Sequence, residues 1–289
     1  MDAHFSDARL CIVGLGLMGG SLGMALKAHQ VCRTVSGADS QAAVLRQAIA
    51  LEAVDEATTD VARAVRRADI VVLATPVRTI ARLIAEIGSS LQPDTLLMDL
   101  GSTKTAIVEA MARLPSHVQA VGGHPMCGKE KAGIAAADPD LYKGAVFCLT
   151  PLERTRPEAL ARAEALVRAI GAHPLVVDCQ RHDAVVAATS HLPYLMATAL
   201  TATAADLAAK DDLVWQVVAS GFRDTSRLAG SDVDMMLDIL LTNQKNVAGR
   251  AREAAQKLLE MAAAIDTGNE EILRGFLAQT QQAWRGVYP

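Results

Sequence analysis

Three closely spaced glycines near the start of the chain constrain its fold more than any other feature. An apolar run, 10–13, leads into Gly14, Gly16 and Gly19, and an amphipathic segment, 21–29, follows. This order predicts a strand, a tight turn and a helix. Gly14 permits the turn, Gly16 lets the backbone approach a pyrophosphate, and Gly19 lets the helix pack closely on the strand. Because a helix amino terminus attracts phosphate, the sequence predicts a dinucleotide site here rather than a chance glycine-rich turn.

A carboxylate stands where such a site needs one. The second apolar run, 34–38, ends in Asp39, about twenty residues beyond the glycines, where an acid accepts a hydrogen bond from a ribose 2′-hydroxyl. Asp39 would repel a 2′-phosphate, so NAD is the expected cofactor, whereas Arg33 and Arg46 keep NADP open. The predicted contacts of the dinucleotide are Gly14, Gly16, Leu17, Met18, Gly19, Asp39, Thr75 and Pro76.

Length and composition exclude several classes of protein. The 289 residues suffice for two domains, and 51% of them are hydrophobic. A net charge of -4 and only 3% aromatic residues argue against nucleic-acid binding. We expect no membrane span, no signal peptide and a cytoplasmic protein. The five cysteines include no C-x-x-C pair and should be reduced, and no histidine–cysteine cluster has the spacing of a metal site.

Strand-like apolar runs alternate with helical segments as far as residue 178. Such alternation is typical of a doubly wound, Rossmann-type parallel sheet with helices on both faces, so we predict a dinucleotide-binding domain over 1–178. After the glycine unit, the expected strands are 68–76, 95–100, 118–121, 145–149 and 174–177, and the expected helices are 78–90, 106–113 and 157–170.

The pattern changes after residue 178. No convincing strand follows, and we predict an all-helical domain over 179–289. Its first helix should cover 181–209, bent at Pro193, and the others 212–220, 232–265 and 269–285. Several faces of this half carry few charges, so it should bury its apolar surface in a second copy of the chain, although a monomeric helical cap remains the alternative.

Ligands of doubly wound sheets bind beyond the carboxyl ends of the strands. One candidate group follows the strand 95–100, where the chain reads DLGSTK. The hydroxyl of Ser102 can orient a neighbour or contact a nicotinamide. The alternative is a helix cap formed by Ser102 or Thr103, which composition alone slightly favours.

A histidine follows the next strand, in the segment GGHPMCGKE. His124 stands between two glycines and a proline, which predicts a rigid loop that a ligand approaches closely, and histidine accepts protons near neutral pH. A lone surface histidine is the alternative. Cys127 is a weaker candidate for a nucleophile, because no base stands beside it in the sequence.

The helical half contains two polar segments, SHLPY at 190–194 and SGFRDTSR at 220–227. Polar residues concentrated in an apolar bundle suggest a lined cleft, in which an arginine can grip a carboxylate with two hydrogen bonds. A solvated turn with an Arg–Asp pair explains the second segment equally well.

Five segments in register resemble the prephenate/arogenate (cyclohexadienyl) dehydrogenase family of tyrosine biosynthesis. They are GLGLMGGSL, DLGSTK, GGHPMCGKE, SHLPY and SGFRDTSRLAGSD, and they extend over nearly the whole chain. The resemblance implies that the first domain binds the nicotinamide cofactor, that the helical domain forms a homodimer, and that the active site lies between them. The reaction would be the oxidative decarboxylation of prephenate to 4-hydroxyphenylpyruvate or of arogenate to tyrosine.

The resemblance also implies roles for single residues. His124 would be the catalytic histidine, hydrogen-bonded to the ring hydroxyl while hydride leaves the same carbon. Ser102 would orient His124 and touch the nicotinamide. One base suffices for this reaction because the aromatic product supplies the driving force and the protein mainly positions the reactants.

The substrate cleft follows from the same resemblance. Arg227 would bind the ring carboxylate that leaves as carbon dioxide. His191 and Ser190 would line the cleft, and Glu130 would belong to a polar network at its mouth. These residues come from three separate segments of the chain.

Two positions depart from the family pattern. Tyr194 stands where a second histidine often contacts the substrate side chain, which leaves the choice between prephenate and arogenate open. Lys129 stands where a small hydroxyl residue is frequent. The string at 220–227 looks closest to members that accept arogenate.

Two other functions are alternatives to this prediction. The β-hydroxyacid dehydrogenases also join a GLGxMG domain to a helical one, but their catalytic lysine follows a glycine-rich helix start, and Lys245 lacks that setting. A non-enzymatic regulator that senses dinucleotides would need no histidine and arginine at the cleft, and a basic surface if DNA were its partner.

Overall fold

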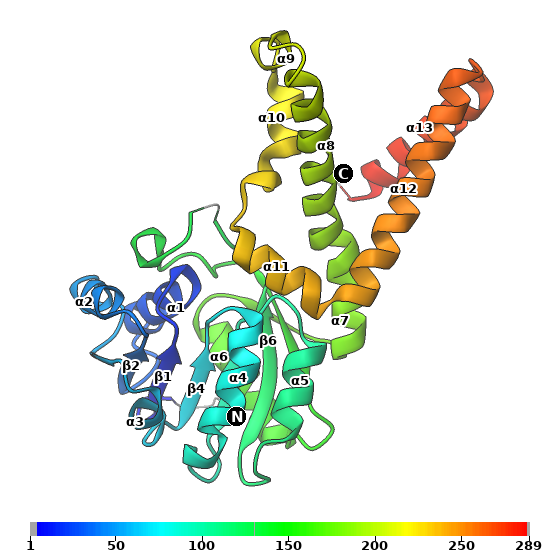
Figure 1. The fold of residues 1–289 in the computed structure, drawn as a ribbon. Helices are drawn as coiled ribbons and strands as arrows, with labels where there is room; N and C mark the ends of the chain where they lie inside the picture. The colour runs from blue at the N-terminus through cyan, green and yellow to red at the C-terminus, as the bar shows by residue number, and fades with distance from the viewer. Residues whose placement is uncertain (1–4, 130, 288–289) are drawn as a thin grey trace.

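The computed structural model describes residues 5–129 and 131–287, which form an α/β body that carries two helical arms (Figure 1). The body contains the sheet and includes the amino terminus of the described chain. The arms rise from one end of it and diverge, one built around α8 and the other around α12 and α13. The helical half therefore stands against one end of the body rather than covering a face of its sheet.

The sheet has eight strands in the order β3-β2-β1-β4-β5-β6-β7-β8. All neighbouring pairs are parallel except β6 and β7, which are antiparallel. The predicted doubly wound fold is confirmed, but the sheet is mostly rather than wholly parallel. The strands are β1 Arg9–Val13, β2 Thr34–Ala38, β3 Glu56–Thr58, β4 Ile70–Leu73, β5 Leu96–Asp99, β6 Gln119–Pro125, β7 Val146–Pro151 and β8 His173–Val176.

The antiparallel pair has a simple cause in the connection between its strands. A parallel neighbour requires a crossover, usually a helix, that returns the chain to the other end of the sheet. Between β6 and β7, the only regular element among the described residues is the short 3₁₀ turn Ile134–Ala136 (η2). The chain therefore re-enters the sheet at the carboxyl end of β6 and runs back, with His124 opposite Cys148.

Helices cover both faces of the sheet, and the core lies in two layers. Alternate side chains of β1 point into opposite layers. Leu10 and Ile12 pack with α1, α2 and α6, whereas Cys11 and Val13 pack with α3, α4 and α5. Strands buried on both faces are apolar throughout, which explains the continuous runs in the sequence. The helices are α1 Leu17–Ala28, α2 Ala42–Ala50, α3 Val61–Val65, α4 Val77–Ile87, α5 Thr105–Ala112 and α6 Pro157–Ala169, with a 3₁₀ turn η1 Gly88–Ser90.

The second half contains helices joined by short turns, and no strand occurs among its described residues. Its long first segment is interrupted by a π-helical turn at Ala187–His191, ahead of the expected bend at Pro193. Pro193, in the first turn of α8, has no N–H to donate to the preceding turn. The wider π turn lies just before it, where the α-helical hydrogen bonds are interrupted. The elements are α7 Cys179–Val186, the π turn η3, α8 Leu192–Ala208, α9 Leu213–Gln216, α10 Ser220–Ser226, η4 Arg227–Gly230, α11 Val233–Thr242, α12 Gln244–Asp266 and α13 Glu270–Val287.

The segment 179–208 corrects the expectation that no apolar stretch is long enough to span a bilayer. It is helical over 30 residues, with a mean hydropathy of 1.2 in its most apolar window, and only 22% of that window is buried. Alanine is its commonest residue, at nine of the 30 positions, so small side chains contribute much of its apolar character. Length and composition alone do not place such a helix in a membrane.

The helical half is fixed to the body through α11 and α7. The side chain and backbone N–H of Arg78, at the start of α4, donate to the carboxylate of Asp238 in α11. The hydroxyls of Thr103 and Thr242 lie 2.8 Å apart. Both contacts are made at the carboxyl ends of the strands, so they set the geometry of the region where ligands of this fold bind.

The glycine turn yields a paired test of packing. A Cβ at Gly19 would lie 1.9 Å from the carbonyl oxygen of Gly14, whereas a Cβ at Gly16 would meet no atom within 4 Å. Gly19→Ala should therefore lower the free energy of unfolding by about 2 kcal/mol, because backbone must move, and Gly16→Ala by less than about 0.5 kcal/mol. Urea unfolding of both variants measures this, and equal losses would contradict the packing described here.

Candidate active site

His124 lies at the carboxyl end of β6, beside the junction of the two halves. Sequence analysis placed it on a loop, but the antiparallel partner β7 extends the ladder to Pro125, so His124 belongs to the strand. Its Nδ1 lies 2.8 Å from Nε2 of His182 in α7. His124 is partly exposed, whereas His182 and His191 are buried. Of these three histidines, His124 is therefore the one that a ligand can reach.

A fully buried ion pair supports the strand beneath His124. Lys104 donates to the carboxylate of Asp99 and, at 2.6 Å, to the carbonyl oxygen of Gly123. Asp99 in turn accepts from the N–H groups of Gly123 at 2.9 Å and Gly101 at 2.7 Å. Burial lowers the pKa of Lys104 and raises that of Asp99, while their mutual attraction opposes both shifts. Both backbone polar groups of Gly123 are thus held, which fixes the residue that precedes His124.

Asp183, in α7, joins the helical half to the amino terminus of α5. Its carboxylate accepts from the backbone N–H of Lys104 at 2.7 Å and of Thr105 at 2.9 Å. The same carboxylate lies 2.8 Å from Nδ1 of His182. An acid at a helix amino terminus satisfies free N–H groups and complements the helix dipole. Asp183 is therefore the cap of α5, supplied from a distant segment.

This contact decides one of the alternatives for the segment DLGSTK. Neither Ser102 nor Thr103 caps α5, because Lys104 occupies the N-cap position without a side-chain cap and Asp183 binds the free N–H groups. The cap interpretation is wrong. Ser102 is partly exposed at the same junction, and the role predicted for it stays a prediction.

His191 lies in the π turn and is buried against Asn243. Nδ2 of Asn243 donates to the carbonyl oxygen of Asp183 at 2.8 Å and lies 3.3 Å from Nδ1 of His191. Burial lowers the pKa of His191 to about 4, although the charge of Asp183 partly opposes this shift. The ring is therefore neutral at physiological pH. Because His191 is buried, its ring is not at the protein surface, and the predicted contact with substrate stays a prediction.

His124 is neutral as well. Burial lowers its pKa well below the ordinary value, and the nearby His182, Lys104 and His191 disfavour a further positive charge, with Asp183 opposing. A neutral ring has one nitrogen free to accept a proton. The arrangement can therefore serve general-base chemistry at His124, the accessible member of these three histidines.

The glycine turn offers a cradle that fits a dinucleotide. Gly14 has a φ of +94°, and a Cβ there would lie 2.7 Å from the carbonyl oxygen of Ala74, whereas Gly16 faces open space. The hydroxyl of Thr75 is buried and has no hydrogen-bond partner among the described residues. Asp39 accepts from the N–H of Leu15 at 3.0 Å, so its carboxylate lies beside the turn.

The other cofactor residues border the same turn. Leu17 and Met18 open α1, and the carbonyl oxygen of Met18 accepts from the hydroxyl of Tyr142 at 2.7 Å. Pro76 is exposed at the start of α4. Their contacts with a bound dinucleotide stay predictions.

The candidates on the helical arms are accessible. Ser190 and Arg227 are exposed and Tyr194 is partly exposed. Arg227 begins η4, which packs along α8, the helix that carries Tyr194. Glu130, predicted at the mouth of the cleft, lies outside the described residues. The neighbouring Lys129 makes an ion pair with Asp138 at 2.8 Å.

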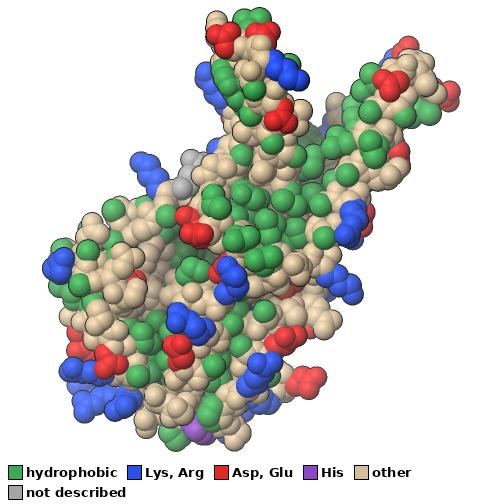
Figure 2. Space-filling view, viewed as in Figure 1, with side chains coloured by type: hydrophobic (Ala, Val, Ile, Leu, Met, Phe, Trp, Pro, Cys, Tyr) green, Lys and Arg blue, Asp and Glu red, His purple; other side chains and the backbone are tan. Residues whose placement is uncertain are grey.

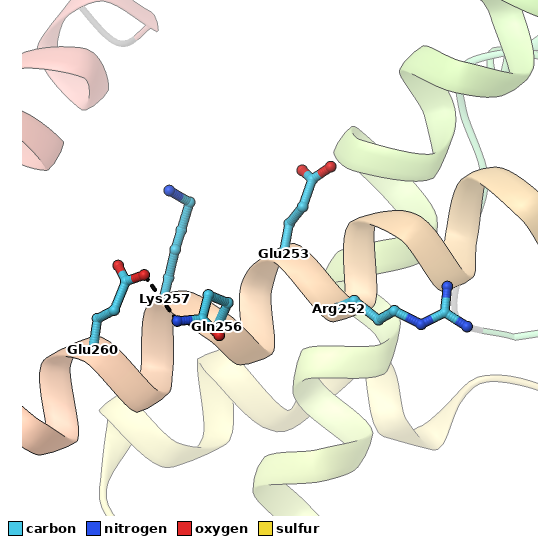
Figure 3. A pocket seen from close by; sticks show the side chains of 5 residues that line it. All are labelled: Arg252, Glu253, Gln256, Lys257 and Glu260. Carbon is cyan, nitrogen blue, oxygen red and sulfur yellow. Dashed lines mark hydrogen bonds between the residues drawn. The ribbon is translucent and has the colours of Figure 1, made fainter.

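The hollow drawn in Figure 3 does not offer a comparable site. It is lined by five side chains of α12, namely Arg252, Glu253, Gln256, Lys257 and Glu260. Charges of both signs alternate along one helix, and their ends do not converge on a common point. It is a stretch of charged helix surface.

Sequence profiles of two prephenate dehydrogenase domains match this chain one after the other. The nucleotide-binding domain matches residues 22–176, and the dimerization domain matches residues 178–279. The chain belongs to the prephenate dehydrogenase family. It is therefore an oxidoreductase with a nucleotide-binding α/β half, and neither a β-hydroxyacid dehydrogenase nor a regulator is supported.

Individual relatives agree with the family. The prephenate dehydrogenase of Bacillus subtilis (strain 168) is 32% identical over 266 residues, which are 91% of this chain and 72% of the relative. The prephenate dehydrogenase of A. aeolicus, solved with hydroxyphenyl propionate and NAD+, superposes with a TM-score of 0.90 and 30% identity over 97% of this chain and 98% of that one. Synechocystis arogenate dehydrogenase superposes with a TM-score of 0.81 and 30% identity over 97% of this chain and 100% of that one.

Sequence reasoning missed the residues that connect the cluster. His182, Asp183 and Asn243 link His124 to His191, yet none of them was a candidate. One signal was present: an adjacent histidine and aspartate lie in the first helix after the last strand, next to the apolar residues 184–188. Polar residues at that point of a helix need partners once the helix is buried.

The low pKa of His191 makes stability depend on pH. A histidine with a folded pKa of about 4 and an unfolded pKa of about 6.5 stabilises the fold fully above pH 6.5 and loses about 3 kcal/mol as the pH falls to about 4. Near pH 5, His191→Gln should therefore reduce the slope of stability against pH by about 1.4 kcal/mol per unit. Urea unfolding at a series of pH values measures the slope. The exposed His29→Gln serves as control, and an unchanged slope in His191→Gln would refute the assignment.

Proposed function

We propose that the protein oxidatively decarboxylates prephenate or arogenate with NAD as the acceptor of hydride. The observation that carries the proposal is His124, a neutral histidine that is accessible at a strand end while its Nδ1 is engaged by His182. Its Nε2 is then free for a substrate hydroxyl. Family membership and the NAD+ in the A. aeolicus structure support the choice of substrate class and cofactor.

The residues of this chain have two tasks in such a reaction. His124 accepts the proton of the ring hydroxyl, so that the carbonyl of the dienone forms as hydride leaves the same carbon. NAD, when bound at the glycine turn, would supply the acceptor for that hydride. Arg227 holds the carboxylate on the opposite ring carbon, which leaves as carbon dioxide and passes its bonding electrons to the ring. Loss of carbon dioxide makes the ring aromatic as a phenolate, to whose oxygen the proton returns, so positioning and a single base suffice.

The remaining site residues take part in binding. Ser102 is proposed to orient His124 and contact the nicotinamide. Ser190, His191, Tyr194 and Glu130 are proposed to form or support the substrate cleft. Tyr194 has a hydroxyl where a second histidine is frequent in the family, so it is the residue that would distinguish a pyruvyl from an alanyl side chain.

The proposed assembly is a homodimer through the helical half, residues 179–289, with residues 1–178 as the nucleotide-binding unit. Large apolar side chains remain exposed there, and Figure 2 shows them gathered on and between the arms. A second copy with the same surface would cover them. They include Leu207, Leu213, Trp215, Val217, Leu258, Leu259, Ile265, Ile272, Leu277 and Trp284. The dimer agrees with the dimerization-domain match, and the five free cysteines agree with a cytoplasmic location.

A cofactor-reduction assay with the purified protein tests the substrate and the cofactor together. Prephenate and arogenate are each supplied with NAD and with NADP. Turnover should be higher with NAD than with NADP, because Asp39 repels a 2′-phosphate beside the glycine turn. Activity with neither substrate would refute the proposed function.

The role of His124 has its own test. His124→Asn keeps a polar side chain but removes the base, so kcat should fall about 10³-fold while the Kd for NAD stays within about twofold. The exposed His29→Asn is the matched control. Steady-state kinetics and NAD titration separate the two effects, and an unchanged kcat would show that His124 is not the base.

A further inference from the structure

We propose that Asp183 is the positioning residue that sets the tautomers of both histidines of the site, leaving Nε2 of His124 bare and Nε2 of His191 protonated. The carboxylate acts on His124 through His182, and the carbonyl group acts on His191 through Asn243. The inference rests on the proposed role of His124 as the base, and it goes beyond that role by stating how the correct nitrogen is kept free.

The first step concerns the carboxylate of Asp183. Burial alone would raise its pKa, but hydrogen bonds from His182 and from Thr105 and Lys104 outweigh burial and lower it. Asp183 is therefore ionised at neutral pH and can only accept hydrogen bonds. Because Nδ1 of His182 lies 2.8 Å from this carboxylate, that nitrogen carries a hydrogen.

The second step concerns the contact between the two rings. Nδ1 of His124 and Nε2 of His182 lie 2.8 Å apart, so one of them donates. His124 can act as the base at Nε2 only if that nitrogen is bare, and its neutral ring then carries its hydrogen on Nδ1. A neutral His182 with its hydrogen on Nδ1 has a bare Nε2, which accepts. His124 must then donate from Nδ1.

The consequence for His124 is a defined direction of proton transfer. With its hydrogen on Nδ1, the neutral ring presents a bare Nε2 to the substrate hydroxyl. When that proton arrives, the imidazolium keeps its hydrogen bond to His182, whose own N–H faces the carboxylate of Asp183. The charge is thus stabilised without further movement of a proton, which is the logic of an orienting carboxylate behind a catalytic histidine.

The opposite tautomer follows at His191. The amide of Asn243 is oriented because its Oδ1 accepts from Asn246 at 2.8 Å. Its Nδ2 therefore donates to the carbonyl oxygen of Asp183 and faces Nδ1 of His191. That nitrogen is an acceptor, so the hydrogen of the neutral ring lies on Nε2. Through these contacts, Asp183 leaves Nε2 of His124 as an acceptor and Nε2 of His191 as a donor.

A pair of variants at His182 tests the relay in the NAD-saturated enzyme. His182→Gln can still accept the Nδ1 hydrogen of His124 through its amide oxygen, whereas His182→Leu cannot, although both side chains are neutral and of similar size. In His182→Leu, kcat should fall about 10²-fold with KM nearly unchanged. His182→Gln should recover at least about tenfold of that loss. Equal losses in both variants would mean a structural role only and would overturn the proposal.

The tautomers are read directly in the unmodified protein, which keeps the test independent of folding of the variants. The full chain is labelled with ¹⁵N at its seven histidines, and long-range ¹H–¹⁵N spectra are recorded with NAD at neutral pH. His124→Asn and His191→Gln assign the two rings. We expect His124 protonated at Nδ1 and His191 at Nε2, and His182→Leu should shift His124 toward the Nε2 tautomer.

The outcomes separate this inference from the proposed function. A wild-type His124 protonated at Nε2 overturns the tautomer assignment, even if His124→Asn is inactive and the base is thereby confirmed. The expected tautomers together with an active His124→Asn confirm the assignment and overturn the base. The proposal stands when the expected tautomers and the rescue by His182→Gln are both observed.

Discussion

The structure depends on the carboxylate of Asp183 more than on any other single group. It binds two N–H groups at the amino terminus of α5 and the ring of His182, and the carbonyl oxygen of the same residue holds Asn243. Hydrogen bonds to a buried charge are among the strongest in proteins, each worth about 1.5–3 kcal/mol. The α/β half and the helical half are therefore joined close to His124. Because α7 is held against α5, His182 of the helical half is held against the ring of His124.

A buried ion pair between Lys104 and Asp99 holds the end of β6 beside His124. Lys104 contributes its N–H to Asp183 and its ammonium to Asp99 and to the backbone of Gly123. The segment between β5 and α5 is thereby tied both to the helical half and to the strand that ends in His124. Buried ion pairs contribute little net stability but specify geometry where both partners are fully hydrogen-bonded. Such specification is what a general base requires, because a proton is transferred only at hydrogen-bonding distance.

The sequence predicted the features that depend on local pattern. The glycine turn, the alternation of strands and helices and the helical second half follow from residues near one another in the chain. The segments β3, α2 and α3 escaped prediction because they are short and weakly patterned. The direction of β7 depends on a connection that lacks a crossover helix, which the strand pattern does not reveal. The cap of α5 depends on a contact between distant segments, because Asp183 lies 79 residues from Lys104. His124 was predicted because two glycines precede it and a proline follows it. His182 has no such neighbours in the sequence and is recognised only by its contacts with His124 and Asp183.

Neutron diffraction from crystals of the full chain with NAD at neutral pH would test the central claim most directly, because it locates hydrogen atoms. We expect no hydrogen on the carboxylate of Asp183, one on Nδ1 of His182 and one on Nδ1 of His124, with Nε2 of His124 bare. A hydrogen on Nε2 of His124, or a protonated Asp183, would contradict that claim.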